Sequence, residues 1–543
     1  MFTTARGSTT RKLRVLALAG LTAAVLVLTA CTGGSPSPKP SGDTVRPNIT
    51  GILPSADLSL YDPMVAGPAN TQGPVMQEIY EGLVAFPPGQ VTLKSIEPSL
   101  ATKWTTSKDG LTWTFTLRKG VQFQGGYGEM TSADVVFSYE RQLDPKAGGS
   151  YSGEFANVKS VTATDAHTVK IVLKEANPYF LVTVGNYHGG YIVSKKAVQK
   201  LGKAFTTQPI GTGPFQLTQY SPTNRVVFTA FDKYWGGKPK LATLTYLFVA
   251  DGSTQLTSLQ SGEVQFGRIA QADGDVASAK ASGLDVKLMS PIAWNLHLNL
   301  NDSPALKDLR VRQALAYGTD RKALAAAFGS TVATPSDALL PASAAGALTS
   351  KDIPKALQYN YSVSKAKSLL AAAGYASGLS FDIEVSDTSV YPVMWQVLQA
   401  QWAKIGVTLN LKQTDHQTFN TDADAGHLSM VVHGGSRVPL AVLFLQEWYG
   451  ADGDSNYSHY GTAMPGIDNL LDKAIKDAVA NDDAGANKLY KQAQIQLLTD
   501  LPAIPLVSIF TPDVKSSNVD LGYKVNDSLV YAFQITAKST VTK

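Results

Sequence analysis

The sequence predicts an α/β protein made of two α/β bodies, and two observations support this prediction. Segments rich in β-branched and aromatic residues alternate with amphipathic segments of helical period along most of the 543 residues. Hydrophobic residues make up 44% of the chain and charged residues 17%, which is an ordinary globular composition. A chain of this length can form two or three domains.

The first α/β region lies between residues 109 and 173. Residues 111–117 and 168–173 favour β-branched and aromatic side chains in partial alternation, which is typical of half-buried strands. Asp109-Gly110 is typical of a hairpin turn before the first of them. Between the strands, Thr131-Ser132-Ala133-Asp134 has the pattern of a capping box, so we expect a helix from there to about Leu143.

The second α/β region has clearer helix boundaries. Residues 311–317 have helical apolar spacing, Asp320 can cap the next helix, and Gly329 can end it. Residues 364–373 repeat the pattern, with Gly374 as the stop.

A βαβ unit follows in the same region. Residues 381–385 and 407–411 have the alternation of strands, and the long amphipathic segment 391–405 lies between them and ends before Gly406. A strand, a helix and a second strand in this order predict two parallel neighbouring strands.

The N-terminal residues predict export. Arg6, Arg11, Lys12 and Arg14 precede an apolar stretch, 15–28, that is too short to span a membrane and ends in Leu28-Thr29-Ala30-Cys31. This pattern resembles a bacterial lipobox. The resemblance implies cleavage before Cys31, a diacylglycerol thioether on its sulfur, and tethering to the outer face of the cytoplasmic membrane. The alternative is a plain signal peptide with an incidental cysteine.

Removal of the leader changes the charge of the chain. Residues 1–30 carry four basic and no acidic side chains, so the mature chain has as many basic as acidic residues, 43 of each. A neutral protein gives no electrostatic reason to expect nucleic acid as a partner. Residues 32–42 are rich in Gly, Ser and Pro and predict a flexible tether, and the folded body should begin near residues 47–52.

Several strings resemble the extracytoplasmic solute-binding proteins of ABC transporters, in the oligopeptide-, dipeptide- and nickel-binding family (family 5, cluster C). The resemblance covers about residues 52–530. The strings occur in the order of the family: IYEGL at 79–83, PSLATKW at 98–104, DGLTWTFTLRKGV at 109–121, ADVV at 133–136, PIGTGPF at 209–215, LQSGE at 259–263, VRQAL at 311–315 with Asp320-Arg321, and AKSLLAAAGY at 366–375. We expect these strings to be mostly scaffold.

The resemblance implies a two-lobed periplasmic-binding-protein type II fold with a hinge between the lobes and a third domain inserted in lobe one. Lobe one would take residues 48–88, 208–296 and 511–543, the inserted domain 89–207 and lobe two 297–510, after a signal peptide, 1–30, and a lipidated linker, 31–47. It also implies a monomer without a cofactor that captures a peptide or peptide-sized solute, encloses it between the lobes and delivers it to the permease subunits of an ABC importer.

The same resemblance places part of the binding site at residues 430–439. Peptide-binding members carry there an aromatic residue, a glycine and an aspartate that holds the peptide's α-amino group. Here the stretch contains Gly434, Gly435, Ser436 and Arg437, and no acidic residue occurs between Asp424 and Glu447. Because Arg437 would repel an ammonium group and pair with a carboxylate or phosphate, it suggests an anionic solute or a metal chelate. In the alternative, Arg437 points to solvent and another acid binds the amino group.

Other candidates for the binding site come from position alone. The resemblance implies that Tyr151 of the inserted domain, Tyr391 and His416 face the solute, and that residues 67–71, including Ala69 and Asn70, offer backbone groups to it. A separate set of aromatic residues could form an apolar wall or belong to the core: Trp448, Tyr449 and Tyr457.

Two competing functions have weaker support. His416, His427 and His433 match no compact metal-ligand spacing, so we expect no metal site. Ser362-Val363-Ser364-Lys365 and the overlapping string that starts at Ser364 are formal Ser-x-x-Lys matches, which could indicate an exported serine acyl-transfer enzyme. The chain lacks the other motifs of such enzymes, so we expect these serines to begin a helix and the protein not to be an enzyme.

Overall fold

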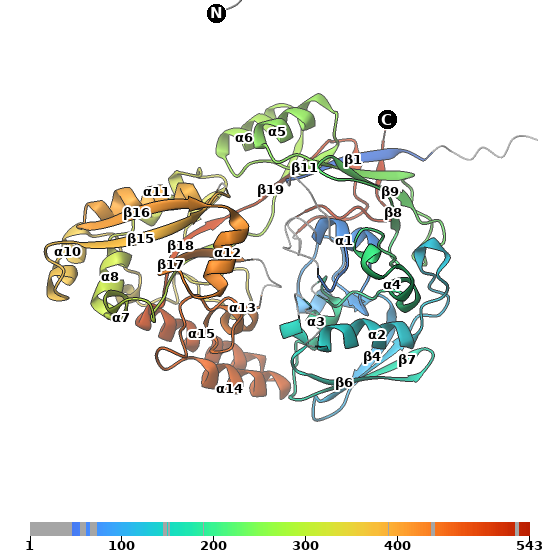
Figure 1. Ribbon diagram of the computed structural model, residues 1–543, viewed down its shortest axis with the longest axis horizontal. Coiled ribbons are helices and arrows are strands. Elements are labelled where there is room, and N and C mark those ends of the chain that lie inside the picture. Colours follow the sequence, from blue (N-terminus) through green and yellow to red (C-terminus); the bar gives the residue numbers. More distant parts are fainter. Residues whose placement is uncertain are drawn as a thin grey trace, which may run out of the picture. The chain divides into compact units, whose positions relative to one another are not determined.

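Two large β-sheets form the framework of the protein, as the computed structural model shows (Figure 1). The structure describes residues 46–54, 61–65, 73–144, 149, 152–187, 189–388, 390–435, 440–526 and 532–542. The predicted leader, the lipidation site Cys31 and the tether lie outside these residues.

The first large sheet has seven strands and is built from segments far apart in the sequence. Its strands lie in the order β12 (Asp285–Leu288), β19 (Pro512–Lys515), β11 (Phe266–Arg268), β1 (Asn48–Leu53), β10 (Thr243–Phe248), β9 (Arg225–Ala230) and β8 (Phe215–Ser221). Strand β1 is parallel to both of its neighbours, whereas the other pairs are antiparallel.

The second large sheet has four antiparallel strands, in the order β14 (Ala333–Pro335), β18 (Ala503–Ile509), β13 (Ile292–Leu298) and β17 (Met430–Gly435). The chain passes between the two sheets twice among the described residues, at 289–291 and at 510–511. These crossings run side by side, because the amide of Met289 donates to the carbonyl of Thr511 at 2.9 Å and Ile292 pairs with Ile509. The expected lobe boundary at 296/297 therefore falls inside β13, all of which pairs in the second sheet.

A separate four-stranded antiparallel sheet is formed by residues between the early strands of the first sheet. Its order is β4 (Ala101–Thr106), β5 (Thr112–Leu117), β7 (Thr168–Leu173) and β6 (Val158–Asp165). The expected strands at 111–117 and 168–173 are confirmed, and Gly110 has the positive φ, 70°, that a tight turn between β4 and β5 requires.

The helix predicted in this region is confirmed with its cap. Helix α2 (Ser132–Leu143) begins after Thr131, whose backbone amide donates to Oδ2 of Asp134 at 3.0 Å in a capping box. Buried side chains of α2, including Val135 and Tyr139, pack on β5, β6 and β7 in one apolar cluster.

The βαβ unit is also confirmed. Strands β15 (Leu379–Ser386) and β16 (Val407–Thr414) are parallel, and α11 (Val390–Ala403) packs against both, as Figure 1 shows. Gly406 ends the unit's helical connection with a φ of 88°, in the left-handed region that favours glycine.

The neighbouring helices begin at the predicted caps. Asp320 accepts from the amides of Lys322 and Ala323 at the start of α9 (Arg321–Ala326), and Ser362 accepts from the amide of Lys365 at the start of α10 (Val363–Ala372). Helix α8 (Leu309–Tyr317) contains the segment expected at 311–317.

The remaining elements complete the described chain. The other helices are α1 (Gly73–Ile79), α3 (Phe180–Gly185), α4 (Lys195–Leu201), α5 (Gly252–Ser261), α6 (Asp273–Ala281), α7 (Pro304–Lys307), α12 (His416–Asp424), α13 (Ala441–Tyr449), α14 (Asp468–Val479) and α15 (Asp483–Asp500). Two-residue strands form the pairs β2 (Val84–Ala85) with β3 (Glu97–Pro98) and β20 (Val519–Asp520) with β21 (Thr540–Val541). None of the helices in the described part of the chain has the length and apolar character needed to span a membrane.

An apolar cluster joins the segment after β2 to the last helices. Val91 and Val182 are buried in it together with α13, α14 and α15, and Phe86 and Leu93 pack against it. At its edge the hydroxyl groups of Tyr179 and Tyr490 form a hydrogen bond of 3.0 Å.

Two arginines of the family strings have structural roles in the second half of the chain. The guanidinium of Arg312, which is 2% exposed, donates to the carbonyls of Leu306, Lys307 and Asp500 at 2.7 to 3.2 Å. Arg321, which is 7% exposed, donates to the carbonyls of Pro505 and Tyr359. Arg312 thus satisfies carbonyl oxygens at the ends of α7 and α15, and Arg321 satisfies one within β18 and one in the loop before α10.

We expect Arg312→Leu to lower the free energy of unfolding by at least about 2 kcal/mol, because three buried carbonyl oxygens lose their donor. Arg310→Leu is the matched control on the same helix: its side chain is 51% exposed and pairs with Asp308, so the loss should stay below about 1 kcal/mol. Urea-induced unfolding of both variants measures the difference. Equal losses would contradict the structural role of Arg312.

Candidate functional site

The centre of the candidate site is Trp294 on β13. In the register of β13 and β17, Trp294 lies opposite Gly434, and a Cβ atom added at Gly434 would come within 2.6 Å of the indole Cδ2. A residue with a side chain therefore cannot occupy position 434 without displacing the tryptophan. Gly435 is next to it, where an added Cβ would lie 3.1 Å from the ring of Trp448.

Tyr391 and His416 extend an aromatic cluster from Trp294, in which the side chains of Trp294 and Tyr391 are each 7% exposed. The rings of Tyr391 and Trp294 meet edge to face with centroids 5.5 Å apart, and the rings of Tyr391 and His416 lie 5.8 Å apart. Phe419, which lies on α12 with His416, packs against the rings of both Tyr391 and His416. The four described candidates Tyr391, His416, Gly434 and Gly435 are thus brought together around β13 and β17.

Hydrogen bonding and burial set the chemistry of these side chains. His416 Nδ1 lies 2.8 Å from the Ser386 hydroxyl oxygen at the end of β15, which orients its ring. Burial lowers the pKa of His416, and the carboxylates of Asp387 and Asp415 oppose this shift. Burial raises the pKa of Tyr391 to about 12, so the tyrosine is a neutral hydrogen-bonding group near pH 7.

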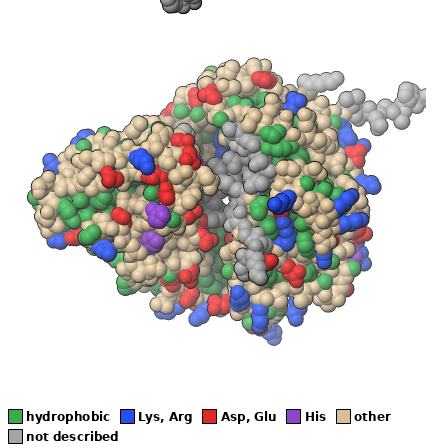
Figure 2. Space-filling model, viewed as in Figure 1, with side chains coloured by type: hydrophobic (Ala, Val, Ile, Leu, Met, Phe, Trp, Pro, Cys, Tyr) green, Lys and Arg blue, Asp and Glu red, His purple; other side chains and the backbone are tan. Residues whose placement is uncertain are grey.

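Three polar residues, His433, Tyr457 and Asp424, lie beside this aromatic cluster. The rings of His433 and Tyr457 are 5.1 Å apart, and the Tyr457 hydroxyl donates to Oδ1 of Asp424 at 3.3 Å. Burial raises the pKa of Asp424, the hydrogen bond from Tyr457 opposes the shift, and the nearby Asp454 carboxylate adds to it. Figure 2 shows acidic side chains and two histidine side chains gathered on the surface around α12. Asp424 is the last residue of that helix.

Trp448 and Tyr449 belong to the core and do not form a wall of the site. Both are fully buried in the cluster that includes Phe444 and Leu445. Their burial follows from the position of α13, because the rings of Trp448 and Tyr449 contact His297 and His433 of the second large sheet. Of the two alternatives, an apolar wall or the core, the structure supports the core for these two residues. Tyr457 is partly exposed and contacts His433 and Asp424.

His297 is a buried neighbour of the site. Its ring stacks on Tyr449 with centroids 5.5 Å apart, and neither ring nitrogen has a hydrogen-bond partner among the described residues. Burial holds the pKa of His297 well below its usual range, and His433 lowers it further, so this imidazole is neutral.

Five candidates lie outside the described residues. They are Tyr151, Ser436, Arg437, Ala69 and Asn70. Sequence reasoning did not select Trp294, which lies before the lobe boundary expected at 296/297, and it names Asp424 only as the last acid before the stretch 430–439. His433 lies inside that stretch, but by itself it is considered only as a metal ligand.

The competing functions gain no support from the structure. No group of three or more His, Cys, Asp or Glu side chains that could hold a metal ion occurs among the described residues. Ser362 caps α10, as expected, and the Lys365 ammonium donates to the Tyr317 hydroxyl at 2.6 Å, away from the serines. The Ser-x-x-Lys string is therefore part of a helix start and does not form a nucleophile with its base.

Comparison with known proteins agrees with the fold and with the expectation that the protein is not an enzyme. Heme-binding protein A of Haemophilus influenzae is 31% identical over 536 residues, covering 90% of this chain and 92% of that protein. The dipeptide-binding protein of Escherichia coli is 30% identical and covers 85% of this chain and 90% of its own length. A solved structure of the binding protein MoaA with mannopinic acid, from A. tumefaciens R10, is 30% identical with a TM-score of 0.83, covering 92% of this chain and 100% of that chain.

A match over residues 95–456 identifies the family of this chain. Residues 95–456 match the family described as "Bacterial extracellular solute-binding proteins, family 5 Middle". Its relatives are substrate-binding proteins and not enzymes, and the similar structures have the type II periplasmic-binding-protein fold, so both expectations are confirmed. The chain therefore belongs to the family 5 solute-binding proteins of ABC transporters.

Proposed function

We propose that this protein captures a peptide or a similarly sized solute outside the cell, encloses it between two lobes and delivers it to the permease of an ABC importer. The observation that carries the proposal is the pair of adjacent crossings at 289–291 and 510–511, next to the aromatic cluster around Trp294. Two short neighbouring segments allow two sheets to rotate as rigid bodies, which is the geometry of hinge closure around a ligand.

The proposed lobes follow the sheets. Lobe one takes the seven-stranded sheet, with residues 48–88, 208–291 and 511–543; the inserted domain takes 89–207; and lobe two takes 292–510, so the boundary expected at 296/297 moves to the start of β13. The solute stabilises the closed form because that form offers it contacts from both sides, and the population shifts accordingly.

The contact between Tyr179 and Tyr490 supports closure. It joins the inserted domain to lobe two at 3.0 Å, beside the apolar cluster of Val91 and Val182. Interactions that exist only in the closed form add to the apparent affinity for the solute, since they lower the cost of closing.

Two residues make opposite predictions about the charge of the solute. The three relatives are described as binding heme, dipeptides and mannopinic acid, so membership of the family does not select one solute. Arg437 favours a solute that presents a carboxylate or another anion to lobe two, whether a peptide-like acid or a metal chelate. Asp424 is the acid that would bind an amino group instead, because it lies beside Tyr457 and His433 at the site.

Membrane anchoring through Cys31 completes the proposed role. The thioether-linked lipid would hold the protein at the outer face of the cytoplasmic membrane, and residues 32–42 would act as the tether. A tether of this kind raises the effective concentration of the loaded protein near its permease without any new contact.

The function is tested by identifying the bound solute. The leader-free protein is purified from its own host, and native mass spectrometry followed by denaturation identifies any retained small molecule. A retained peptide or organic anion that radiolabelled uptake shows to depend on this protein supports solute capture. Uptake of that molecule that is unchanged in a deletion strain contradicts it.

The charge of the solute is tested with two variants. We expect Arg437→Ala to weaken binding of the co-purified solute about 10- to 100-fold by calorimetry, because a charge-assisted hydrogen bond is lost. Asp424→Asn should change the affinity less than about twofold. Arg225→Ala, on exposed residue 225 of β9, is the control for the loss of a positive charge. The reverse order of effects would assign an amino group of the solute to Asp424.

The closing contact is tested by Tyr490→Phe. Removal of one hydroxyl should weaken solute binding about two- to tenfold, because a hydrogen bond contributes about 0.5 to 1.5 kcal/mol to the closed form. Tyr361→Phe is the control, because Tyr361 is 39% exposed, and it should leave the dissociation constant unchanged. An unchanged affinity in Tyr490→Phe would remove this contact from the closing mechanism.

Anchoring is tested by Cys31→Ser. The mature wild-type protein should sediment with membranes and carry the added mass of a diacylglycerol in intact mass spectrometry, whereas the variant lacks the sulfur that accepts the lipid and should leave the membrane fraction. A wild-type protein that is released without added mass would support the plain signal peptide.

A further inference from the structure

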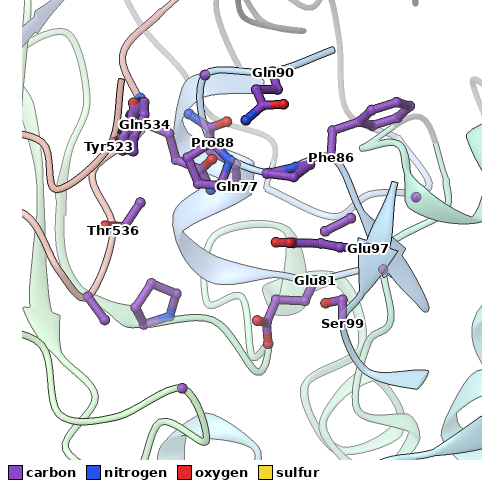
Figure 3. Close-up of a pocket in the computed structure, with 18 of the residues that line it drawn as sticks. Gln77, Glu81, Phe86, Pro88, Gln90, Glu97, Ser99, Tyr523, Gln534 and Thr536 are labelled. Carbon is purple, nitrogen blue, oxygen red and sulfur yellow. Dashed lines mark hydrogen bonds between the residues drawn. The ribbon is translucent and has the colours of Figure 1, made fainter. Parts of the chain in front are cut away.

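A cavity lies away from the candidate site, between the end of α1, the β2–β3 pair and the C-terminal segment (Figure 3). Its volume is about 420 Å³, which suits a small organic molecule. The described residues that line it come from 77–99, 185–236 and 522–538. None of them belongs to the aromatic cluster around Trp294, Tyr391 and His416, so the cavity is separate from the proposed solute site.

The walls of the cavity are held by buried hydrogen bonds. The Glu81 carboxylate accepts from the Trp235 indole, the Thr212 hydroxyl and the Tyr234 hydroxyl at 2.8 to 2.9 Å. Burial raises the pKa of Glu81 to about 7, and these three donors oppose the shift. Because its oxygens are already hydrogen-bonded, Glu81 fixes the wall and is not available to a ligand. The Arg118 guanidinium lies 4.0 Å from the centre of the Trp235 ring.

The opposite side of the cavity is also closed by the backbone. Gly89 has a φ of 80°, and its carbonyl accepts from the amide of Asn526 at 2.9 Å. A Cβ atom at this position would lie 2.3 Å from the carbonyl oxygen of Lys524, so only glycine allows the segment after β2 to approach the C-terminal segment this closely. The cavity is therefore preformed.

Several polar side chains in this cavity have no partner. Figure 3 shows the Glu97 side chain extending from β3 into the middle of the cavity. Among the described residues, Glu97 has neither an ion pair nor a side-chain hydrogen bond, and the buried Nε2 of Gln77 has no acceptor. The amides of Gln90 and Gln534 border the same space in Figure 3.

The charges around the cavity select the class of ligand. Glu81 and Glu97 are the acidic residues among its described lining residues and Lys538 is the basic one. A carboxylate without a counter-charge favours a cation, which disfavours an anionic guest, and the amides of the three glutamines disfavour a purely apolar one. An uncharged polyol could pair with the amides but would leave the Glu97 carboxylate without a positive partner.

We propose that this cavity is a second binding site, which takes a small primary amine that also carries hydrogen-bond acceptors. The ammonium group pairs with the Glu97 carboxylate, and an oxygen of the ligand accepts from Gln77 Nε2. The site requires neither closure of the lobes nor an identified solute, so it stands apart from the proposed function.

The proposal is tested by calorimetry on the leader-free protein with glucosamine and ethanolamine as amines, and with glucose and ethylene glycol as their uncharged counterparts. We expect at least one amine to bind and its uncharged counterpart to bind at least about tenfold more weakly. Glu97→Gln should lower the affinity for the amine at least about tenfold, because it removes the charge and keeps the shape of the side chain.

The matched control is Glu263→Gln, on an exposed residue in the turn between α5 and β11, which should bind the amine as the wild type does. Three results would overturn the proposal: no heat of binding from either amine at millimolar concentration, an equal affinity for glucose or ethylene glycol, or an affinity that Glu97→Gln leaves unchanged. The last result would also place any bound amine elsewhere, for example in the site near Asp424.

Discussion

The structure depends on one constraint, which is that the described chain passes between the two large sheets only at the short crossings 289–291 and 510–511. The backbone hydrogen bond from Met289 to Thr511 keeps these crossings together, and the pairing of Ile292 with Ile509 continues the contact into the second sheet. Residues of the two sheets that contact the same solute must therefore be brought together by movement about these two crossings. A sheet on either side and only two short neighbouring segments of chain between them favour rotation over local deformation.

The site is built on the rigid side of that connection. Trp294 lies on β13, a few residues after the first crossing, and Gly434 leaves the space that its indole ring occupies. Tyr391 and His416 come from the helices that cover the βαβ unit, and their rings pack on one another. In the proposed mechanism, side chains held by packing on sheets and helices would keep their geometry when the lobes move, so affinity would depend on how well the open form can close.

Local features were predictable from the sequence because they depend on neighbouring residues. Spacing alone predicts three helix starts and one supersecondary unit, and the structure confirms them. They are the Thr131 capping box, the Asp320 and Ser362 caps, and the β15–α11–β16 unit. The order of the seven-stranded sheet was not predictable, since β1 pairs with strands more than a hundred residues away. The core position of Trp448 also depends on tertiary packing, because an aromatic residue on an apolar helix face has the same pattern whether it faces core or cleft.

The central claim is that solute closes one lobe on the other about the two crossings. Single-molecule energy transfer between dyes on Glu263→Cys and Lys412→Cys, in a leader-free chain without Cys31, measures it directly. Both positions are exposed; Glu263 lies in the turn before β11 of the seven-stranded sheet, in proposed lobe one, and Lys412 lies on β16, in proposed lobe two. Addition of the co-purified solute should shift the population toward a shorter distance between the dyes, and the midpoint of the shift should match the dissociation constant. Saturating binding with an unchanged distance distribution would contradict closure about these crossings.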